Sequence, residues 1–544
     1  MKKYIYLAII ALVSTSCEDF LYRPPMDAIS SGSYWNDEAD LKGGINNLYN
    51  FMNHTWNEDV QSIDVYSGSL NNISSGTYTT PETDAVWSSS YEGIYYVHEF
   101  LDNYKSASLA SDEVKARYRG EALYFRALLH FNLVKRFGDT VIVTSKLGLS
   151  SPELYGTRDD RTEVIDFILE DLEEAIELLP TQSWIISNND DEDGRISQGA
   201  ALALSARIAL YEGTHCKFHG HDSDKVEGYL TTARNNALAL INSGEYSLEV
   251  DNLKDLFGPK GEGSSEVILA YRYDESQGSA NSRHSTIANG NGFMPTKYLV
   301  DAFLCTDGLP IETSPLFMGR ETITSEFENR DPRMANTIWT PLTEHPNLTE
   351  PYVPNLSTSY VGYLFYKGMD DSLISSGGSS YTDEILFRLT EAYLIYAEAS
   401  YELNDAISDT ELDASINILR DRVGMPSLTN SFVATNSLNM QEEIRRERRI
   451  ELASEGFRYD DIIRWKTAED ELILPVLGSQ YYAEYYVSEE TGEDYLSGES
   501  LNDENYIVVQ SESGRYFVDP KNYLFPIPTY ELGLNANLGQ NEGW

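Results

Sequence analysis

Alanine-rich helical segments are the feature that most restricts how this chain can fold. Residues 194–213, GRISQGAALALSARIALYEG, indicate a helix that begins at a Ser197 cap and ends at Gly213. Residues 229–246, YLTTARNNALALINSGEY, repeat the pattern with a stop at Gly244. Small side chains let neighbouring helices approach closely, as in tetratricopeptide-like hairpins. The strict repeat signature is absent, so we predict divergent hairpins.

Further helical patterns occur on both sides of an irregular middle region. The patterns cover residues 111–138, capped by Ser111 and stopped at Gly138, and residues 161–180, 383–404, 411–424 and 444–455. Between and after them, the segments SEVILAYRYDE (265–275) and YVGYLFYKG (360–368) are typical of strands, residues 276–296 are rich in Gly, Asn and Ser, and 506–520 predict a hairpin turning at Ser513-Gly514. We predict a mainly α scaffold that carries long loops and a few short strands.

Several charged residues occupy helical positions at which the apolar periodicity of the segment predicts a buried side chain. The segment IRRERRIELASEGFRYDDIIRW, residues 444–465, holds six arginines in a chain with a formal net charge of −47. Arginine can bond both oxygens of a carboxylate, and a pair avoids the cost of an isolated buried ion. We favour a structural ion-pair network between helices over a phosphate site or plain solvated faces. Its expected members are Arg126, Arg388, Glu391, Arg420, Glu447, Arg448 and Glu451.

The charge balance excludes one class of partner. The chain has 87 acidic and 40 basic residues. Such a field repels phosphate, whereas nucleic-acid affinity depends mainly on neutralising phosphates. We therefore expect no nucleic-acid partner.

The N-terminal segment MKKYIYLAIIALVSTSC has the layout of a secretory signal. Two lysines precede an apolar run that is too short to span a bilayer, and small residues lead to Cys17. We expect a signal peptide over residues 1–16. The site resembles that of a bacterial lipoprotein, with Cys17 as the lipidated first residue, although ordinary signal cleavage is the alternative. Glu18 and Asp19 resemble the acidic signal that directs some lipoproteins to the cell surface.

Cysteine and histidine content gives little indication of a metal site. Cys216 and Cys305 could form one disulfide, but a chain of this size does not need one, and two buried free thiols are favoured. The cluster HCKFHGHDSD contains zinc-type ligands in His215, His219 and His221. Gly213 and Gly220 argue against one helix aligning His215 with His219, so we expect a solvated inter-helix loop and no metal.

Catalytic motifs are absent from the sequence. There is no G-x-S-x-G elbow, P-loop or H-E-x-x-H helix, and with 87 acidic residues a carboxylate pair arises at any spacing by chance. We therefore expect no enzyme activity and no cofactor.

Several stretches resemble a known family, the SusD/RagB outer-membrane lipoproteins. The similarity runs in order through CEDFLYRPP, RGEALYFRALLHFNLVKRFG, GRISQGAALALSARIALY, LVDAFLCTDGLPI, LFRLTEAYLIYAEA, INILRDRVGMP, RRERRIELASEGFRYDDIIRW and YLFPIPTYELGLNANLGQNEGW. So many ordered matches cover nearly the whole chain after Cys17.

The resemblance implies a fold and a role. It implies one SusD-like domain over residues 17–544, with about four tetratricopeptide-like units. Within it, residues 17–250 would hold the hairpins, 251–384 a loop- and strand-rich insertion and 385–544 the C-terminal part. The expected protein sits on the cell surface, anchored in the outer membrane by a lipid on Cys17. It would bind an oligosaccharide or polysaccharide and deliver it to a SusC-like TonB-dependent transporter. RagB-like peptide binding, or a structural lid without its own ligand, are the alternatives.

Non-catalytic sugar recognition requires aromatic faces and hydroxyl partners, and loops usually carry them. The aromatic candidates are Trp56, Tyr66, Tyr78, Trp87, Phe293 and Trp339. The hydroxyl-partner candidates are Asn71, Asn72, Asn289 and Asn291. Each aromatic residue has a core alternative, and Trp87, four residues before Tyr91, fits one side of a core helix.

Overall fold

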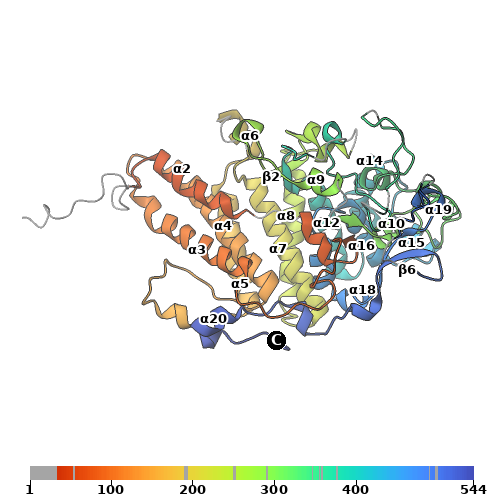
Figure 1. Ribbon diagram of the computed structural model, residues 1–544. Coiled ribbons are helices and arrows are strands. Elements are labelled where there is room, and N and C mark those ends of the chain that lie inside the picture. The colour runs from red at the N-terminus through yellow and green to blue at the C-terminus, as the bar shows by residue number, and fades with distance from the viewer. Residues whose placement is uncertain are drawn as a thin grey trace, which may run out of the picture.

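Long helices build one half of the molecule, and loops with short elements build the other (Figure 1). The computed structural model describes residues 34–52, 56–188, 194–248, 253–288, 292–345, 347–354, 356, 359–374, 378–488, 491–496 and 500–544. The helices are α2 (Glu38–Asn46), α3 (Ala85–Asn103), α4 (Asp112–Phe137), α5 (Arg161–Leu178), α6 (Gln182–Asn188), α7 (Gln198–His219), α8 (Val226–Asn242), α9 (Arg283–Ala288), α10 (Lys297–Ala302), α11 (Pro332–Thr337), α12 (Leu389–Asn404), α13 (Asp409–Asp413), α14 (Ile416–Arg422), α15 (Asn430–Thr435), α16 (Met440–Glu451), α17 (Arg458–Arg464), α18 (Ala468–Glu471), α19 (Ala483–Tyr486) and α20 (Thr529–Leu534). This content confirms the mainly α fold class.

The long helices pack in chain order, as hairpins do. Helix α3 packs on α4, α4 on α5, α5 on α7, α7 on α8 and α8 on α12. Small residues permit the close crossings: a Cβ added to Gly213 would lie 2.9 Å from a methyl carbon of Leu230, between α7 and α8. Ser111 caps α4 by accepting a hydrogen bond from the Val114 N–H, and Gly138 follows its last residue.

Helix α7 is longer than its sequence predicts, which corrects the stop at Gly213. It continues to His219 and ends at Gly220, whose φ of 74° is left-handed. A glycine inside a helix costs only about 1 kcal/mol, which packing against Leu230 outweighs. Positive φ at Gly220 is the stronger stop signal.

Within the described residues, three small antiparallel sheets join segments that are separated in the sequence. The strands are β1 (Val65–Tyr66), β2 (Val267–Tyr271), β3 (Met294–Pro295), β4 (Glu384–Arg388), β5 (Val476–Gln480), β6 (Ser500–Leu501) and β7 (Tyr506–Gln510). They pair as β1 with β3, β2 with β4, and β5-β7-β6. Residues 384–388 were expected to begin a helix but form strand β4, because the predicted strand β2 needs a partner and pairs with them.

Two other strand predictions are wrong. Residues 360–368 form only the isolated Ile338–Phe365 bridge, because positive φ at Gly362 and Gly368 interrupts an extended run. Residues 506–520 form no hairpin: β7 has β5 on one side and β6 on the other, and Glu512–Gly514 turn as a short 3₁₀ helix. Both edges of β7 are therefore occupied.

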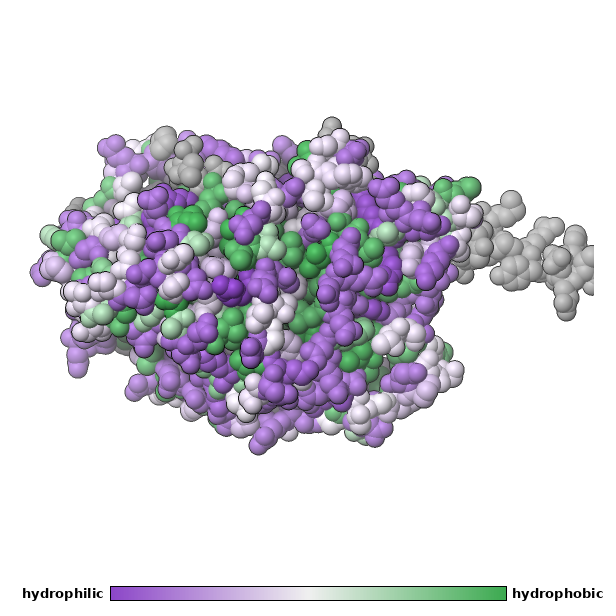
Figure 2. All heavy atoms as spheres, turned by 180° about the vertical axis from the view of Figure 1, so that it is seen from behind, coloured by the Kyte–Doolittle hydropathy of each residue, from purple (hydrophilic) through white to green (hydrophobic). Residues whose placement is uncertain are grey.

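The core has two main parts. The larger apolar cluster fills the helical scaffold, and a second cluster, containing Phe293, Trp339 and Phe365, lies beneath the loops. On the face turned away from the view of Figure 1, hydrophobic residues lie in patches among hydrophilic ones (Figure 2). The loop-rich half therefore has its own packed support.

Buried ion pairs connect the C-terminal helices to each other and to the loops. Glu447 on α16 accepts from Arg420 at 2.8 Å and from Arg333 at 2.5 Å. Glu451, one turn further, accepts from Arg333 at 2.9 Å and from Arg422 at 2.6 Å. Arg388 bonds Glu266 and Glu455, while the remaining expected members form the pairs Arg126–Asp171, Arg207–Glu391 and Arg448–Asp461. Carboxylates of the 444–465 segment thus receive arginines from other elements, and Arg464 of the same segment pairs with Glu398 on α12.

Candidate ligand-binding surface

Three of the aromatic residues singled out from sequence are core residues. Trp87 is 5% exposed and packs against Tyr91 and Phe137, with ring centroids 5.1 and 5.2 Å away. Phe293 and Trp339 are 1% and 4% exposed, within the second apolar cluster. Their ring faces are covered by other side chains, so we correct these three assignments to core packing.

The remaining aromatic candidates are partly buried. Trp56 meets Phe293 edge-on at 4.9 Å and lies beneath the Arg283 guanidinium. Tyr78 meets Phe525 edge-on at 5.3 Å, and Tyr66 pairs within the β1–β3 ladder. These three rings pack against other residues at the edges of the apolar clusters. Less of each ring face is therefore accessible to a ligand than in an exposed aromatic residue.

The asparagine candidates divide into three cases. The Asn71 side-chain oxygen accepts from the backbone N–H groups of Ile73 and Ser74, both at 3.0 Å, which is a turn-forming role. Asn72 is exposed. Asn289 and Asn291 lie outside the described residues.

A cluster of tyrosines beside an ion pair forms a different surface, which we call the tyrosine surface and define by Tyr271, Tyr273, Tyr381, Arg272 and Asp383. Tyr271 ends β2, and its ring centroid lies 5.2 Å from that of Tyr273. Arg272 bonds Asp383 at 2.7 Å, and the Tyr273 backbone N–H donates to the same carboxylate at 3.0 Å. Tyr381, as a whole residue, is 39% exposed.

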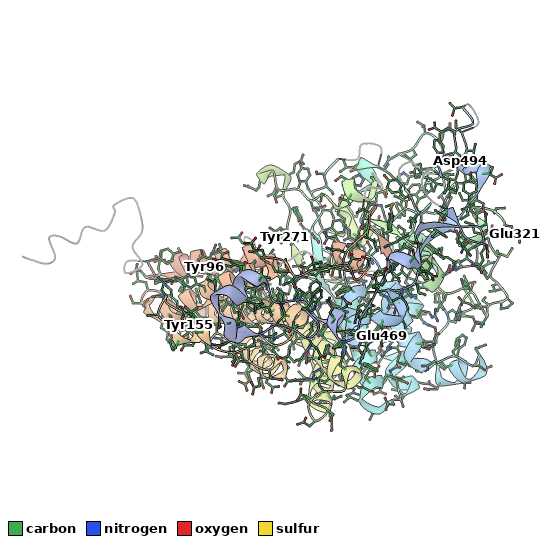
Figure 3. The ribbon with its side chains drawn as sticks, turned by 60° about the horizontal axis from the view of Figure 1, so that its bottom comes forward. Tyr96, Tyr155, Tyr271, Glu321, Glu469 and Asp494 are labelled. Atoms are coloured by element: carbon green, nitrogen blue, oxygen red, sulfur yellow. The ribbon has the colours of Figure 1, made fainter. Side chains whose placement is uncertain are left out.

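Backbone pairing holds the two strands of this surface together. Asn281 exchanges backbone hydrogen bonds with Ser380, and its side chain donates to the Thr382 carbonyl at 2.6 Å. This fixes the segment that carries Tyr381 beside the segment that follows β2. Figure 3 places Tyr271 between the helical and the loop-rich halves of the molecule, apart from Tyr96 and Tyr155.

Of the charged groups at the tyrosine surface, Asp383 is the one most sheltered from water, since its side chain is 12% exposed. A hollow of about 260 Å³ is lined by Arg272, Thr382, Asp383 and Glu262, among others. Burial raises the pKa of the Glu262 carboxyl, and nearby Asp383 raises it further, while Arg272 opposes the shift. Burial also raises the pKa of the Tyr273 hydroxyl, with a contribution from Glu384. A guanidinium and two carboxylates therefore line one hollow, and Tyr271 and Tyr273 flank Arg272 in the sequence, which suits a hydroxyl-rich ligand.

Sequence reasoning missed these tyrosines because 38 tyrosines are spread through the chain. The alternation Tyr-Arg-Tyr at the end of the expected strand 265–275 was the available signal, because it places both rings on one face. The contribution of Tyr381 was invisible, because residues 384–388 were expected to be helical.

His215 and His219 lie on helix α7, where a loop was expected, and His221 follows the end of the helix. His215 and His219 stack in parallel with ring centroids 3.9 Å apart. Donor atoms of Glu212, His215 and His221 lie within 4.8 Å of one another. Cys216, on the same helix, and Cys305 are buried free thiols.

Hydrogen-bond directions account for the polar atoms of this cluster without a metal. Arg161 bonds both Glu212 oxygens, at 2.8 and 2.7 Å, and lies 3.0 Å from His215 Nε2. A guanidinium only donates, so His215 carries its proton on Nδ1 and donates to His221 Nε2 at 2.8 Å. His221 Nδ1 then donates to Asp222 at 3.0 Å. Binding a metal at His215 Nδ1 would put a proton on Nε2 against Arg161, so we assign no metal here.

Comparison with known protein families identifies the chain. Residues 265–544, just over half of the chain, match the model described as the SusD family. The chain belongs to the SusD family. Residues 26–210 match a second model, described as starch-binding and associating with the outer membrane. The two matches together cover helices α2 to α6, most of α7 and the C-terminal half of this SusD-family protein, and they confirm the resemblance seen in its sequence.

SusD-like relatives and structures span nearly the whole chain. SusD-like protein P25 of Formosa agariphila is 24% identical over 497 residues, covering 83% of this chain and 87% of the relative. A SusD-like protein of Bacteroides ovatus is 22% identical, covering 85% and 82%. The structure of a SusD-like carbohydrate binding protein from Bacteroides fragilis has a TM-score of 0.76 at 24% identity, covering 93% of this chain and 100% of that one. A laminarin binding SusD-like protein has a TM-score of 0.64 at 21% identity, covering 94% and 100%. At these identities the structures establish the shared fold.

Within the described part of the chain, no helix has both the length and the apolar character needed to cross a membrane.

Proposed function

We propose that this SusD-family protein binds an oligosaccharide or polysaccharide at the tyrosine surface and delivers it to a SusC-like TonB-dependent transporter, without altering it chemically. The observation that carries the proposal is the Tyr271–Tyr273 ring pair beside the Arg272–Asp383 ion pair, with the exposed Tyr381 on the adjoining segment. Tyrosine rings cover the apolar faces of sugar rings, and the charged groups bond hydroxyls. A glycan-binding family model and carbohydrate-binding structural neighbours support this ligand class.

The proposed location is the cell surface. Lipidation of Cys17 would attach the chain to the outer membrane, in agreement with the family model described as associating with that membrane. Anchoring by a lipid leaves the folded part in water and needs no spanning helix.

Calorimetric titration with a panel of oligosaccharides, polysaccharides and peptides tests the ligand class. We expect at least one glycan to bind and the peptides to give no heat. Tyr381→Ala removes the most exposed ring of the surface and should weaken that binding about tenfold, which corresponds to about 1.4 kcal/mol. Tyr155→Ala is the matched control, because Tyr155 is 59% exposed and lies elsewhere.

The alternatives predict different results. Peptide binding without a sugar response would indicate a RagB-like role. Copurification with the transporter, with no ligand bound by the isolated chain, would indicate a structural lid. Shortened oligosaccharides after prolonged incubation would indicate an enzyme and would overturn the proposal.

A further inference from the structure

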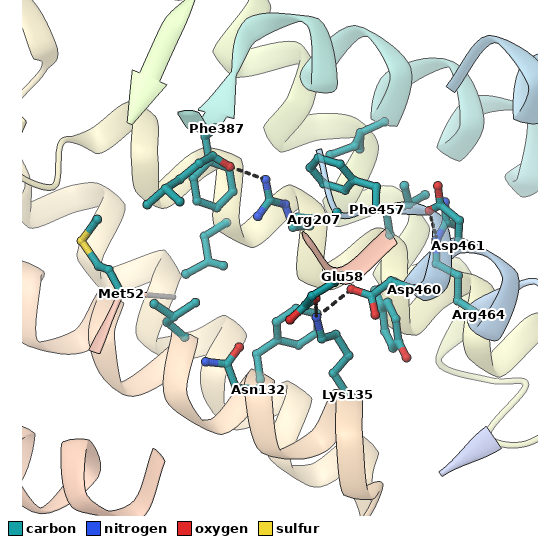
Figure 4. A pocket seen from close by; sticks show the side chains of 18 of the residues that line it. Met52, Glu58, Asn132, Lys135, Arg207, Phe387, Phe457, Asp460, Asp461 and Arg464 are labelled. Atoms are coloured by element: carbon teal, nitrogen blue, oxygen red, sulfur yellow. Dashed lines mark hydrogen bonds and ion pairs between the residues drawn. The ribbon is translucent and has the colours of Figure 1, made fainter. Parts of the chain in front are cut away.

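An interior pocket between α4, α7, β4 and α17 is too small for a sugar ring (Figure 4). Its cavity is about 80 Å³, whereas small-molecule sites usually have on the order of 300 Å³ or more. The charged groups inside it bond one another, as Lys135 does with Asp460 at 2.7 Å. This pocket therefore does not serve as a further glycan site, and the surface is where a further contact can form.

An exposed tryptophan stands on helix α6, outside the tyrosine surface. All seven tryptophans lie in the described part of the chain, and Trp184, at 40%, is the most exposed of them. An indole offers a larger apolar face than a tyrosine ring, and covering it removes apolar area from water. Trp184 is therefore the tryptophan most accessible to a sugar ring.

Neighbouring residues hold Trp184 in place. The Glu245 carboxylate accepts from the Ser183 backbone N–H at 2.7 Å and from its hydroxyl at 2.9 Å, which fixes the first turn of α6. The Arg117 guanidinium of α4 lies 5.5 Å from the centre of the Trp184 ring. Asn188 shares a face of the helix with Trp184 and donates to its carbonyl at 2.9 Å. A ring that is already ordered loses little conformational freedom when a sugar stacks on it.

Packed side chains connect the support of α6 to the tyrosine surface. Arg117 also lies over the ring of Tyr118, at 5.5 Å, and Arg195 lies over that ring at 5.2 Å. The residue before Arg195 contacts the tyrosine surface, because a Cβ added to Gly194 would lie 3.3 Å from Cγ of Arg272. Helix α6 is thus joined to the tyrosine surface by a short series of direct contacts.

The backbone provides a second connection. Ser247, two residues after Glu245, donates from its N–H to the Ser265 carbonyl at 3.0 Å, and Ser265 lies two residues before β2. Glu245 holds α6 at one end of this link, and β2 carries Tyr271 at the other end. In Figure 1, α6 lies at the top of the molecule close to β2. Both connections place α6 next to the strand that leads into the tyrosine surface.

We propose that Trp184 is a second stacking contact for the glycan that binds at the tyrosine surface. The inference rests on that proposed function and extends it: the ligand is a chain of several sugar rings, since the side chains of Arg117 and Arg195 separate the two contacts. One ring would stack on the tyrosines and a ring further along the chain on Trp184, with its hydroxyls bonding the Asn188 amide. Two linked contacts act together on one chain, so a polysaccharide should bind more tightly than a short oligosaccharide.

A series of chain lengths tests the proposal. Size-fractionated oligosaccharides, from disaccharide to octasaccharide, are prepared from each polysaccharide that binds in the calorimetric panel. Wild-type affinity should rise with chain length. Trp184→Ala should weaken binding of the longest chains about tenfold, through loss of one stacking contact, and should leave the shortest binding chains unaffected. Tyr381→Ala should weaken binding of both.

Two further variants separate stacking from the stability of α6. Ile186→Ala removes a side chain of the same helix that is 50% exposed and has no ring, and it should leave the affinity for every chain length unchanged. Trp184→Phe keeps a smaller ring and should recover part of the long-chain affinity. Because the other tryptophans are less exposed, long chains should shift the tryptophan emission of the wild type and not that of Trp184→Phe. Thermal unfolding establishes that each variant is folded.

The results distinguish this inference from the proposed function. If short chains bind through Tyr381 and Trp184→Ala leaves the long-chain affinity unchanged, the second contact is overturned and the proposed function stands. Equal losses for short and long chains in Trp184→Ala would also overturn the second contact, because Trp184 would then belong to the first. No binding of any glycan would overturn both.

Discussion

Arg420 on α14 and Glu447 on α16 form an ion pair of 2.8 Å in which both side chains are buried. Glu447 also accepts from Arg333, which lies on α11. One carboxylate thus joins three helices. Removing two charges from water costs free energy, which offsets much of the attraction between them. The pair therefore matters mainly because it fixes how the helices are arranged, and because losing one member leaves an uncompensated buried charge.

Glu447→Gln should therefore destabilise the protein by about 3–5 kcal/mol, because two buried guanidinium groups lose their shared charge partner. Urea unfolding followed by circular dichroism measures this. The control is Lys260→Met, which removes the exposed Lys260–Asp255 pair and should change stability by less than about 1 kcal/mol. Equal effects in the two variants would contradict the structural role of the buried network.

The stability should also depend on pH through His130. Burial lowers the pKa of this imidazole to about 3, while the unfolded side chain titrates near 6.5. Between these values only the unfolded state takes up the proton, so stability falls as the pH falls below 6.5. The loss is about 1.4 kcal/mol per pH unit for this group.

His130→Leu removes this titration. At pH 7 the variant should be less stable by about 1–3 kcal/mol, because the Val143 N–H loses its acceptor, His130 Nε2. The stability gap between wild type and variant should narrow by about 2–3 kcal/mol between pH 6.5 and 4.5. Urea unfolding at several pH values checks this, and a gap that stays constant would show that His130 is not buried as a neutral group.

Gly76 closes the loop that follows β1. Its φ is +68°, and an added Cβ would overlap the carbonyl oxygen of Tyr516. Gly76→Ala should therefore lower the thermal midpoint. Gly263→Ala is a matched control, since φ is +74° there and nothing lies within 4 Å. Gly263→Ala should cost only the left-handed backbone strain of about 1–2 kcal/mol. Gly76→Ala should destabilise the protein by more than this, because the steric overlap adds to the same backbone strain. Similar midpoints would mean that Tyr516 moves aside freely.

Asp383 anchors the tyrosine surface. Asp383→Asn keeps an oxygen for the Tyr273 N–H but removes the charge that holds Arg272. Because the Arg272 side chain is 44% exposed, stability should change by less than about 1 kcal/mol. Glycan affinity should fall severalfold, since Arg272 is released from its position. Calorimetric titration measures the glycan affinity. An unchanged affinity in the variant would show that the Arg272–Asp383 pair does not contribute to the proposed site.

The helices that carry clear caps are those that local sequence predicts well. Ser111 and Gly138 mark the ends of α4, and Ser197 marks the start of α7, because caps act through bonds within a few residues. The predictions of element type and helix end fail where contact with a residue distant in the sequence determines the local structure. Residues 384–388 become a strand because β2 is beside them, and Gly213 continues α7 because Leu230 packs against it.

The sequence alone determined the helical class, the family and the presence of charges at core positions, because these follow from periodic patterns and short-range signals. Tertiary structure decided which charges meet, which aromatic rings are covered and which lie together at the surface. Trp87 is a core ring and Tyr381 a surface ring, although both stand in polar segments of the sequence. Burial depends on what other segments of the chain pack against a side chain, and that information is not local.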